Sequence, residues 1–140
     1  MKLKDFIQSH DIDQSKNLID ESLLKAAEQM TGISFGSELR EYLLQYGYLG
    51  YGFAELYGMN ARQGLNSDMV KETLYLHEYY PETKEFVAIE NQGEGDYYLV
   101  NGRDEVYEYD ANLGKLVQMK YTLFEYIVHR FEQVDQTLNT

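Results

Sequence analysis

The apolar positions of this chain follow a helical period over most of residues 1–80 and a strand pattern over most of residues 85–119. In the first part they recur every three or four residues, which is the spacing of a helix face. Leu39, Tyr42, Leu43 and Tyr46 are one such set. This spacing predicts a short helix around Leu3–Ile7, a helix from Asp20 that Gly32 ends, and helices over Ser37–Tyr46 and Ser67–His77.

Short apolar runs separated by turn residues follow Pro81, and they predict strands. The dipeptide Asn101-Gly102 between two of these runs is a strong hairpin signal. We expect strands over residues 53–57, 85–90, 96–100, 105–110 and 115–119, and turns or loops over residues 10–17, 47–52 and 60–66. Thr122-Leu-Phe-Glu125 matches a capping box that opens a last amphipathic helix.

Helices, then a meander of strands, then a helix is the order of an α+β fold. The short turns favour hairpin pairing over parallel crossovers. The 140 residues suit one domain, and no linker or internal repeat divides them. We therefore expect a single domain over residues 1–140, with a central antiparallel sheet of about five short strands flanked by four to five helices.

Charge changes the picture more than any other feature of the composition. The chain has 24 acidic and 12 basic residues and a net charge of −12. Phosphate backbones and anionic membranes repel such a chain, so we expect neither nucleic acid nor a membrane as its partner. It contains no Cys, which excludes disulfides and Cys-based metal sites. The start lacks the apolar run of a signal peptide, and we expect a cytoplasmic protein that is a monomer or a weak dimer.

The negative charge is concentrated in one segment. Residues 78–110 hold ten acidic residues, two basic residues and six tyrosines. Tyrosine combines an apolar ring with a polar tip, so acidic residues beside exposed tyrosines would form a docking surface for a basic protein. The same pattern also fits tyrosines that fill the core beneath a solvated acidic face.

We find no set of residues that predicts catalysis. The chain lacks a thiol and a Gly-x-Ser-x-Gly motif, and its three histidines lie in unrelated segments. Glu125 and His129 stand four residues apart on one helix face, but no third ligand accompanies them, so a surface pair is favoured over a metal site. Gly47–Gly52 lacks the strand, helix and Lys of a phosphate loop, and residues 92–96 lack the ligands of a calcium loop. We therefore expect no enzyme, no cofactor and no metal.

An ordered series of motifs resembles the SUKH superfamily of Smi/Knr-type domains. Its pieces include Ile33-Ser-Phe-Gly36, a helix ending at Tyr46-Gly47, and Glu55-Leu-Tyr-Gly58. Phe86-Val-Ala-Ile-Glu-Asn91 and Glu105-Val-Tyr-Glu-Tyr-Asp110 follow in the family's order, and the resemblance covers about residues 20–132. Two positions depart from the family pattern, which usually has Pro at Gly36 and often has Trp at Tyr109.

The resemblance implies helices around an antiparallel sheet. Because bacterial members neutralise toxins, it also implies an immunity protein that binds a cognate toxin. A nuclease-type toxin would be basic and would attract an acidic inhibitor. The second hypothesis is an intracellular scaffold or regulator without a toxin partner, as the yeast cell-wall members suggest. We predict that the partner-binding residues are Tyr48, Tyr51, Glu55, Glu94, Asp96, Tyr97, Glu105 and Glu108.

Overall fold

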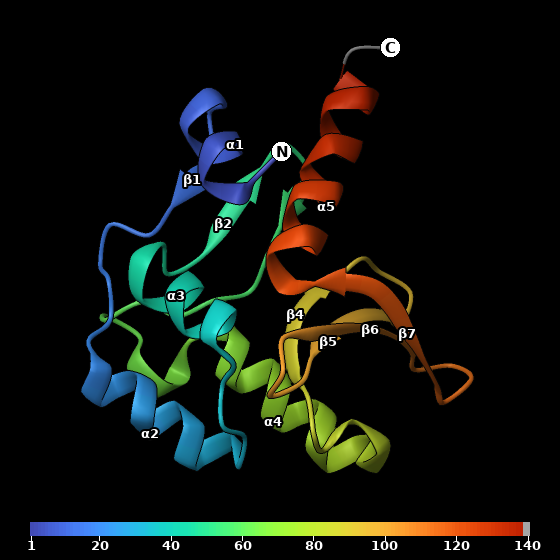
Figure 1. Cartoon of the computed structure of the whole chain (residues 1–140). Helices are drawn as coiled ribbons and strands as arrows, with labels where there is room; N and C mark the ends of the chain where they lie inside the picture. Colours follow the sequence, from blue (N-terminus) through green and yellow to red (C-terminus); the bar gives the residue numbers. More distant parts are fainter. Residues whose placement is uncertain (139–140) are drawn as a thin grey trace.

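The computed structural model describes residues 1–138, which form five α-helices, two short 3-10 helices and two antiparallel sheets (Figure 1). The α+β class is therefore confirmed. The helices are α1 (Leu3–Ser9), α2 (Glu21–Thr31), α3 (Ser37–Gln45), η1 (Gly64–Asn66), α4 (Asp68–Tyr79), η2 (Pro81–Thr83) and α5 (Leu123–Leu138). The strands are β1 (Asp13–Gln14), β2 (Leu49–Tyr51), β3 (Ala54–Glu55), β4 (Val87–Asn91), β5 (Asp96–Val100), β6 (Glu105–Asp110) and β7 (Lys115–Thr122).

The prediction of one central sheet with about five strands is wrong, because the strands divide into sheets of three and four. The four later strands pair in the order β4-β5-β6-β7, as their hairpins predict. β3 instead pairs with β2, and β2 pairs with β1. Residues 47–52, for which the sequence predicts a turn, contain β2. Gly50 is extended there and lies opposite both Asp13 and Glu55. The two sheets meet where the Tyr57 N–H donates to the Ile89 carbonyl at 2.7 Å.

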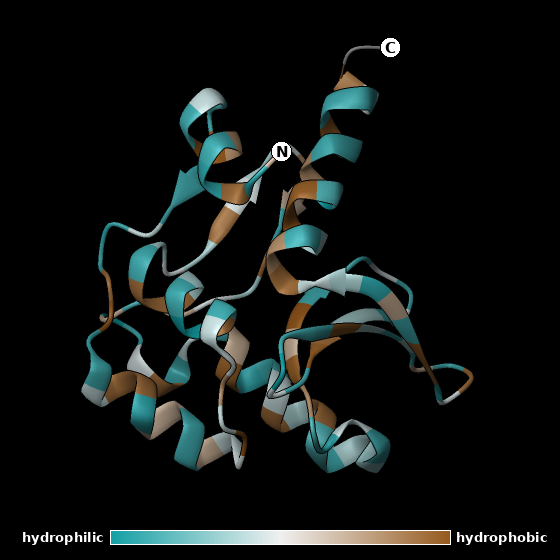
Figure 2. Ribbon diagram, viewed as in Figure 1, coloured by the Kyte–Doolittle hydropathy of each residue, from teal (hydrophilic) through white to brown (hydrophobic). Residues whose placement is uncertain are grey.

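The four-stranded sheet lies between α4 and α5, which cover opposite faces of it (Figure 1). Figure 2 shows apolar residues along β4, and alternation along the strands gives each face of the sheet its own core. Val87, Val100 and Val106 belong to the large core that includes α5 and the first three helices. Leu99 and Tyr109 belong to a smaller core with Leu76 of α4. Each fully buried apolar side chain stabilises the fold by about 1.5–3 kcal/mol.

α2 begins and ends where the sequence predicts. Asp20 is its N-cap, and its carboxylate accepts the Leu23 N–H at 2.8 Å. Gly32 ends the helix with a φ of 75°, a left-handed conformation that glycine adopts without strain. At the start of α5, the Glu125 carboxylate accepts the Thr122 N–H at 2.9 Å, which is one half of the predicted capping box.

The N-terminus of α3 is capped by a residue from a distant hairpin. The Asp104 carboxylate, in the turn between β5 and β6, accepts the N–H groups of Glu38 and Leu39 at 3.0 and 3.1 Å. These bonds satisfy two free donors of the helix end and join α3 to the sheet. A Cβ atom on Gly36 would lie 2.4 Å from this carboxylate. The space that a Pro side chain would need at residue 36 is therefore filled by Asp104.

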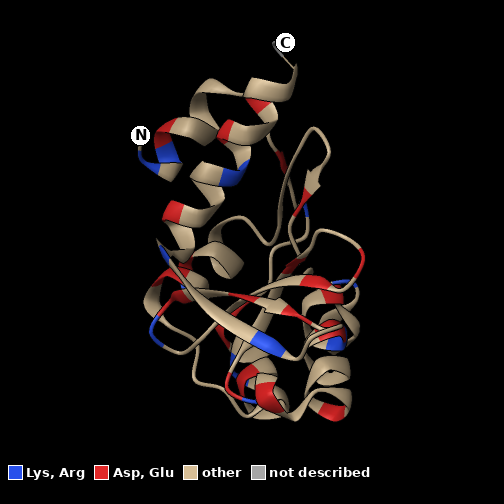
Figure 3. Ribbon diagram, turned by 90° about the vertical axis from the view of Figure 1, so that its right-hand side faces the viewer, with Lys and Arg blue, Asp and Glu red and all other residues tan. Residues whose placement is uncertain are grey.

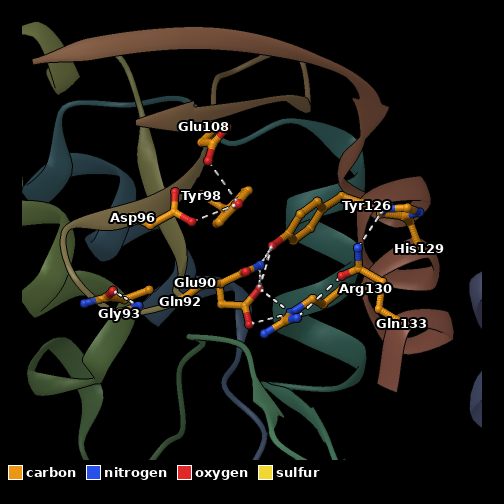
Figure 4. Close-up of polar contacts among 11 residues, drawn as sticks. Glu90, Gln92, Gly93, Asp96, Tyr98, Glu108, Tyr126, His129, Arg130 and Gln133 are labelled. Carbon is orange, nitrogen blue, oxygen red and sulfur yellow. Dashed lines mark hydrogen bonds and ion pairs between the residues drawn. The ribbon is translucent and has the colours of Figure 1, made fainter. Parts of the chain in front are cut away.

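A buried ion pair fastens α5 to the sheet. The Arg130 Nε atom lies 2.9 Å from Glu90 Oε2, and the two side chains are only 12% and 2% exposed. Tyr126, one turn earlier on α5, donates its hydroxyl to Glu90 Oε1 at 2.5 Å (Figure 4). A charge so deeply buried is tolerated only when it is paired and hydrogen-bonded, and Glu90 satisfies both conditions.

We predict that Gly36→Ala lowers the free energy of unfolding by about 1–3 kcal/mol, because the new methyl group displaces the carboxylate that caps α3. Urea denaturation measures this change. In an Asp104→Ala background the space is vacant, so the same substitution should cost much less. An equal cost in both backgrounds would contradict the assignment of the Asp104 cap.

We predict that Glu90→Gln lowers the free energy of unfolding by about 3–5 kcal/mol, because the buried Arg130 loses its counter-charge. The matched control is Glu21→Gln, which breaks an exposed pair with Arg40 whose carboxylate side chain is 70% exposed. That control should change stability by less than about 1 kcal/mol. Thermal and urea unfolding measure both variants, and similar losses in the two would rule out a special role for the buried pair.

Candidate partner-binding surface

Strand register gathers four carboxylates at one end of the four-stranded sheet. Asp96 lies opposite Asp110, and the next residue of β5 on the same face, Tyr98, lies opposite Glu108. Glu94 stands beside them in the turn between β4 and β5, with a φ of 55°. We call Glu94, Asp96, Glu108 and Asp110 the acidic sheet end.

Two turns hold the acidic sheet end in place. The Gln92 N–H donates to the Asp96 carbonyl at 2.8 Å and closes the turn between β4 and β5. The second turn is bonded to the first, because the Ala111 N–H donates to the Gly95 carbonyl at 2.9 Å. The Asn112 amide also donates to the Glu94 carbonyl at 2.7 Å. These bonds limit the freedom of the backbone that carries the carboxylates.

Tyr98 lies between two of these carboxylates. Its hydroxyl is 3.1 Å from Asp96 Oδ2 and 3.2 Å from Glu108 Oε2 (Figure 4). Its ring stacks on Tyr126 of α5, with centroids 5.3 Å apart, and Tyr126 is held by Glu90. A chain of contacts through Tyr126 therefore links the buried ion pair to the hydroxyl that lies between the two acidic side chains.

The electrostatics of this arrangement favour a cation. Burial and the two carboxylates raise the pKa of Tyr98, which keeps its hydroxyl protonated. One hydroxyl proton serves only one acceptor at a time, so the two carboxylates compete for it. The pKa of Glu108 is raised, first by its contact with Asp96 and then by partial burial. A guanidinium or ammonium group placed between them would relieve this repulsion.

A cleft lies next to the Glu90–Arg130 pair, between β3, the start of α4 and the turn after β4. Its volume is about 500 Å³, and its lining includes Phe53, Glu55 and Tyr57 together with the buried pair. The Arg130 guanidinium stands over the Phe53 ring at 5.3 Å, so part of the wall is a cation–π contact. The cleft is therefore a second surface that bears carboxylates, in addition to the acidic sheet end.

The structure brings together only some of the residues predicted to bind a partner. Glu94, Asp96 and Glu108 share the acidic sheet end. Glu105 is at the opposite end of β6, where it pairs with Arg103, and Tyr97 is buried on the face toward α4. The other three belong to the region of the smaller sheet: Tyr48 is exposed before β2, Tyr51 packs against Phe6 and donates its hydroxyl to Asp135, and Glu55 lines the cleft.

The ten acidic residues of segment 78–110 therefore do not form one surface. Glu90 and Asp104 are buried and have structural partners, and Glu82 accepts the hydroxyl of Tyr109. Figure 3 shows acidic residues recurring over the strands, turns and lower helices, with fewer basic residues among them. The acidic sheet end is the part of this charge that strand pairing makes continuous.

Two members of the site were missed from the sequence, Tyr98 and Asp110. Alternation in β5 places Tyr98 on the same face as Asp96, and this signal was available. The pairing of Asp96 with Asp110 depends on the register of the hairpin, and the lengths of the two strands do not fix that register.

Across residues 1–138, no three His, Cys, Asp or Glu side chains are placed to hold a metal ion. Glu125 caps the start of α5, and the His129 ring stacks on Tyr121 at 4.8 Å. No helix in this part of the chain is long and apolar enough to cross a membrane.

Comparison with known protein families gives one result over nearly the whole chain. A search of curated proteins found no match. The family model SUKH_5, described as SMI1-KNR4 cell-wall, matches residues 3–132. This range extends the resemblance seen in the sequence by including α1 and β1. The chain therefore belongs to the SUKH_5 family of SMI1-KNR4 domains.

Proposed function

We propose that this chain is an immunity protein that binds a cognate basic toxin domain, of the nuclease type, through the acidic sheet end. Membership of a family typical of immunity proteins supports a role in protein binding. The observation that carries the proposal is the pair of carboxylates, Asp96 and Glu108, that competes for the single hydroxyl of Tyr98.

Charge complementarity supplies both speed and selectivity in this proposal. A nuclease must present Lys and Arg to hold phosphates, and a chain of net charge −12 attracts such a surface over several ångströms. Arg or Lys side chains of the toxin would then contact the acidic sheet end and exclude its nucleic-acid substrate. This mode of inhibition needs no chemistry from the immunity protein, only a surface of fixed shape and charge.

Co-expression tests the proposal. The toxin domain encoded beside this gene should kill a bacterial host when expressed alone, and the host should survive when this chain is present. The two proteins should purify as a complex, and their association should slow strongly between low and physiological salt. Death of the host in both cases, or binding to several endogenous proteins without protection, would contradict the proposal and favour a scaffold or regulator.

We predict that Asp96→Asn stabilises the free protein while it weakens the complex. The folded protein holds the Glu108 proton more tightly than the unfolded chain does, so the free energy of unfolding falls as pH rises through the raised pKa of Glu108. Without the charge at residue 96 this loss is smaller. We expect a gain of about 0.5 kcal/mol at pH 7, since water screens the pair, and no gain below about pH 3.

The same variant should bind the toxin at least about tenfold more weakly, because one of the two carboxylates is gone. Calorimetry and thermal unfolding measure the two effects. The matched control is Glu132→Gln, which removes an exposed carboxylate from α5. A loss of affinity equal in both variants would show that only net charge matters, and unchanged affinity in Asp96→Asn would remove the acidic sheet end from the interface.

A further inference from the structure

Two tyrosines on α4 expose their rings side by side. Tyr75 is 45% exposed and Tyr79 is 62% exposed. They stand four residues apart on one helix face, and their ring centroids are 4.9 Å apart. A pair of large aromatic rings open to water is more typical of an interaction surface than of a solvated helix.

The exposed pair continues into further tyrosines. The Tyr80 ring lies 6.3 Å from that of Tyr75 and 5.7 Å from that of Tyr109, which belongs to β6. We call Tyr75, Tyr79 and Tyr80 the tyrosine patch. Tyr109 is fully buried, so it supports the patch from behind, and it limits the motion of Tyr80. Rigid aromatic rings lose little conformational entropy when they bind a partner.

Carboxylates border the tyrosine patch. Residues 72–85, which contain the patch, include four acidic residues and one basic residue, Lys84. The pKa of Tyr75 is raised, first by the neighbouring Tyr80 and also by the negative charge of Glu72. Glu82, in η2, accepts the hydroxyl of Tyr109. Glu72, one turn before Tyr75, acts on the neighbouring strand: the pKa of Tyr97 is raised, first by burial and then by the negative charge of Glu72. The patch therefore combines aromatic faces with nearby negative charge.

The tyrosine patch is next to the acidic sheet end. Tyr97 and Tyr109 pair with each other in β5 and β6, and the next pair of residues along the strands is Asp96 and Asp110. The two surfaces thus meet at the same end of the sheet, one on the α4 side and one on the α5 side. A partner that covers this end of the sheet would reach both.

We propose that the tyrosine patch binds arginine side chains of a basic protein, as a second contact surface beside the acidic sheet end. This inference rests on the proposed function, because it assigns the patch to the same basic partner. Arginine fits better than lysine, since a planar guanidinium stacks on a tyrosine ring while it pairs with a neighbouring carboxylate. A second copy of this chain fits poorly, because two molecules of net charge −12 repel each other.

Peptides of eight arginines and of eight lysines test the proposal on the full chain. NMR of ring-labelled tyrosine gives both the affinity and the site. We expect the arginine peptide to shift the signals of Tyr75 and Tyr79 and to bind more tightly than the lysine peptide. The double variant Tyr75→Leu/Tyr79→Leu should weaken the arginine peptide about fivefold to tenfold, and Tyr75→Phe/Tyr79→Phe should keep most of the affinity, since a phenyl ring still attracts a cation.

The control is Tyr121→Leu, which removes a partly exposed tyrosine of β7 whose ring stacks on His129. Equal binding of the two peptides, no effect of the double leucine variant, or an equal effect of the control would overturn the proposal. A dimer in sedimentation that the double variant dissociates would also overturn it. If the arginine pattern holds but co-expression gives no protection from the toxin, the proposed function fails and the arginine site stands. If co-expression protects the host but the chain shows no preference for arginine, the proposed function stands and the arginine site fails.

Discussion

The ion pair between Glu90 and Arg130 is the interaction on which the rest of the structure depends. It fixes α5 against β4 at a point where neither charge reaches water freely. Tyr126 donates a hydrogen bond to the same carboxylate, and its ring stacks on that of Tyr98. The Tyr98 hydroxyl in turn lies between Asp96 and Glu108. A buried charge pair contributes little net stability compared with apolar packing, but it allows only one arrangement of its partners. In this protein that arrangement fixes the ring on which Tyr98 stacks, and Tyr98 lies beside two carboxylates that strand pairing places at the surface.

Local signals in the sequence predicted most of the helices and the four-stranded meander. Asp20 and Gly32 act through atoms of their own helix, so their meaning can be read without the rest of the fold. The smaller sheet could not be predicted in this way. β1 and β3 have two residues each, and β2 contains a glycine that is extended although its neighbourhood resembles a turn. Such short strands exist because they pair with each other, and pairing is a property of the folded chain.

The binding surface was predicted in part for the same reason. The concentration of acidic residues in segment 78–110 was visible, but their roles were not. Asp104 and Glu90 look like solvated acids in the sequence, yet one caps α3 and the other is the buried centre of the fold. Conversely, Tyr98 looks like a core residue and its ring is buried, while its hydroxyl reaches the surface carboxylates. Which carboxylates remain free for a partner depends on contacts between segments far apart in the sequence.

The proposed function depends on one contact, in which a cationic protein docks at the end of the sheet formed by the turns after β4 and β6. Hydrogen–deuterium exchange of the chain, alone and bound to its toxin, locates the contact most directly. We expect slower exchange of backbone amides in residues 92–98 and 108–115 when the toxin is bound, with little change in β1, β2 and β3. Protection confined to those three strands, with unchanged exchange at the acidic sheet end, would contradict it.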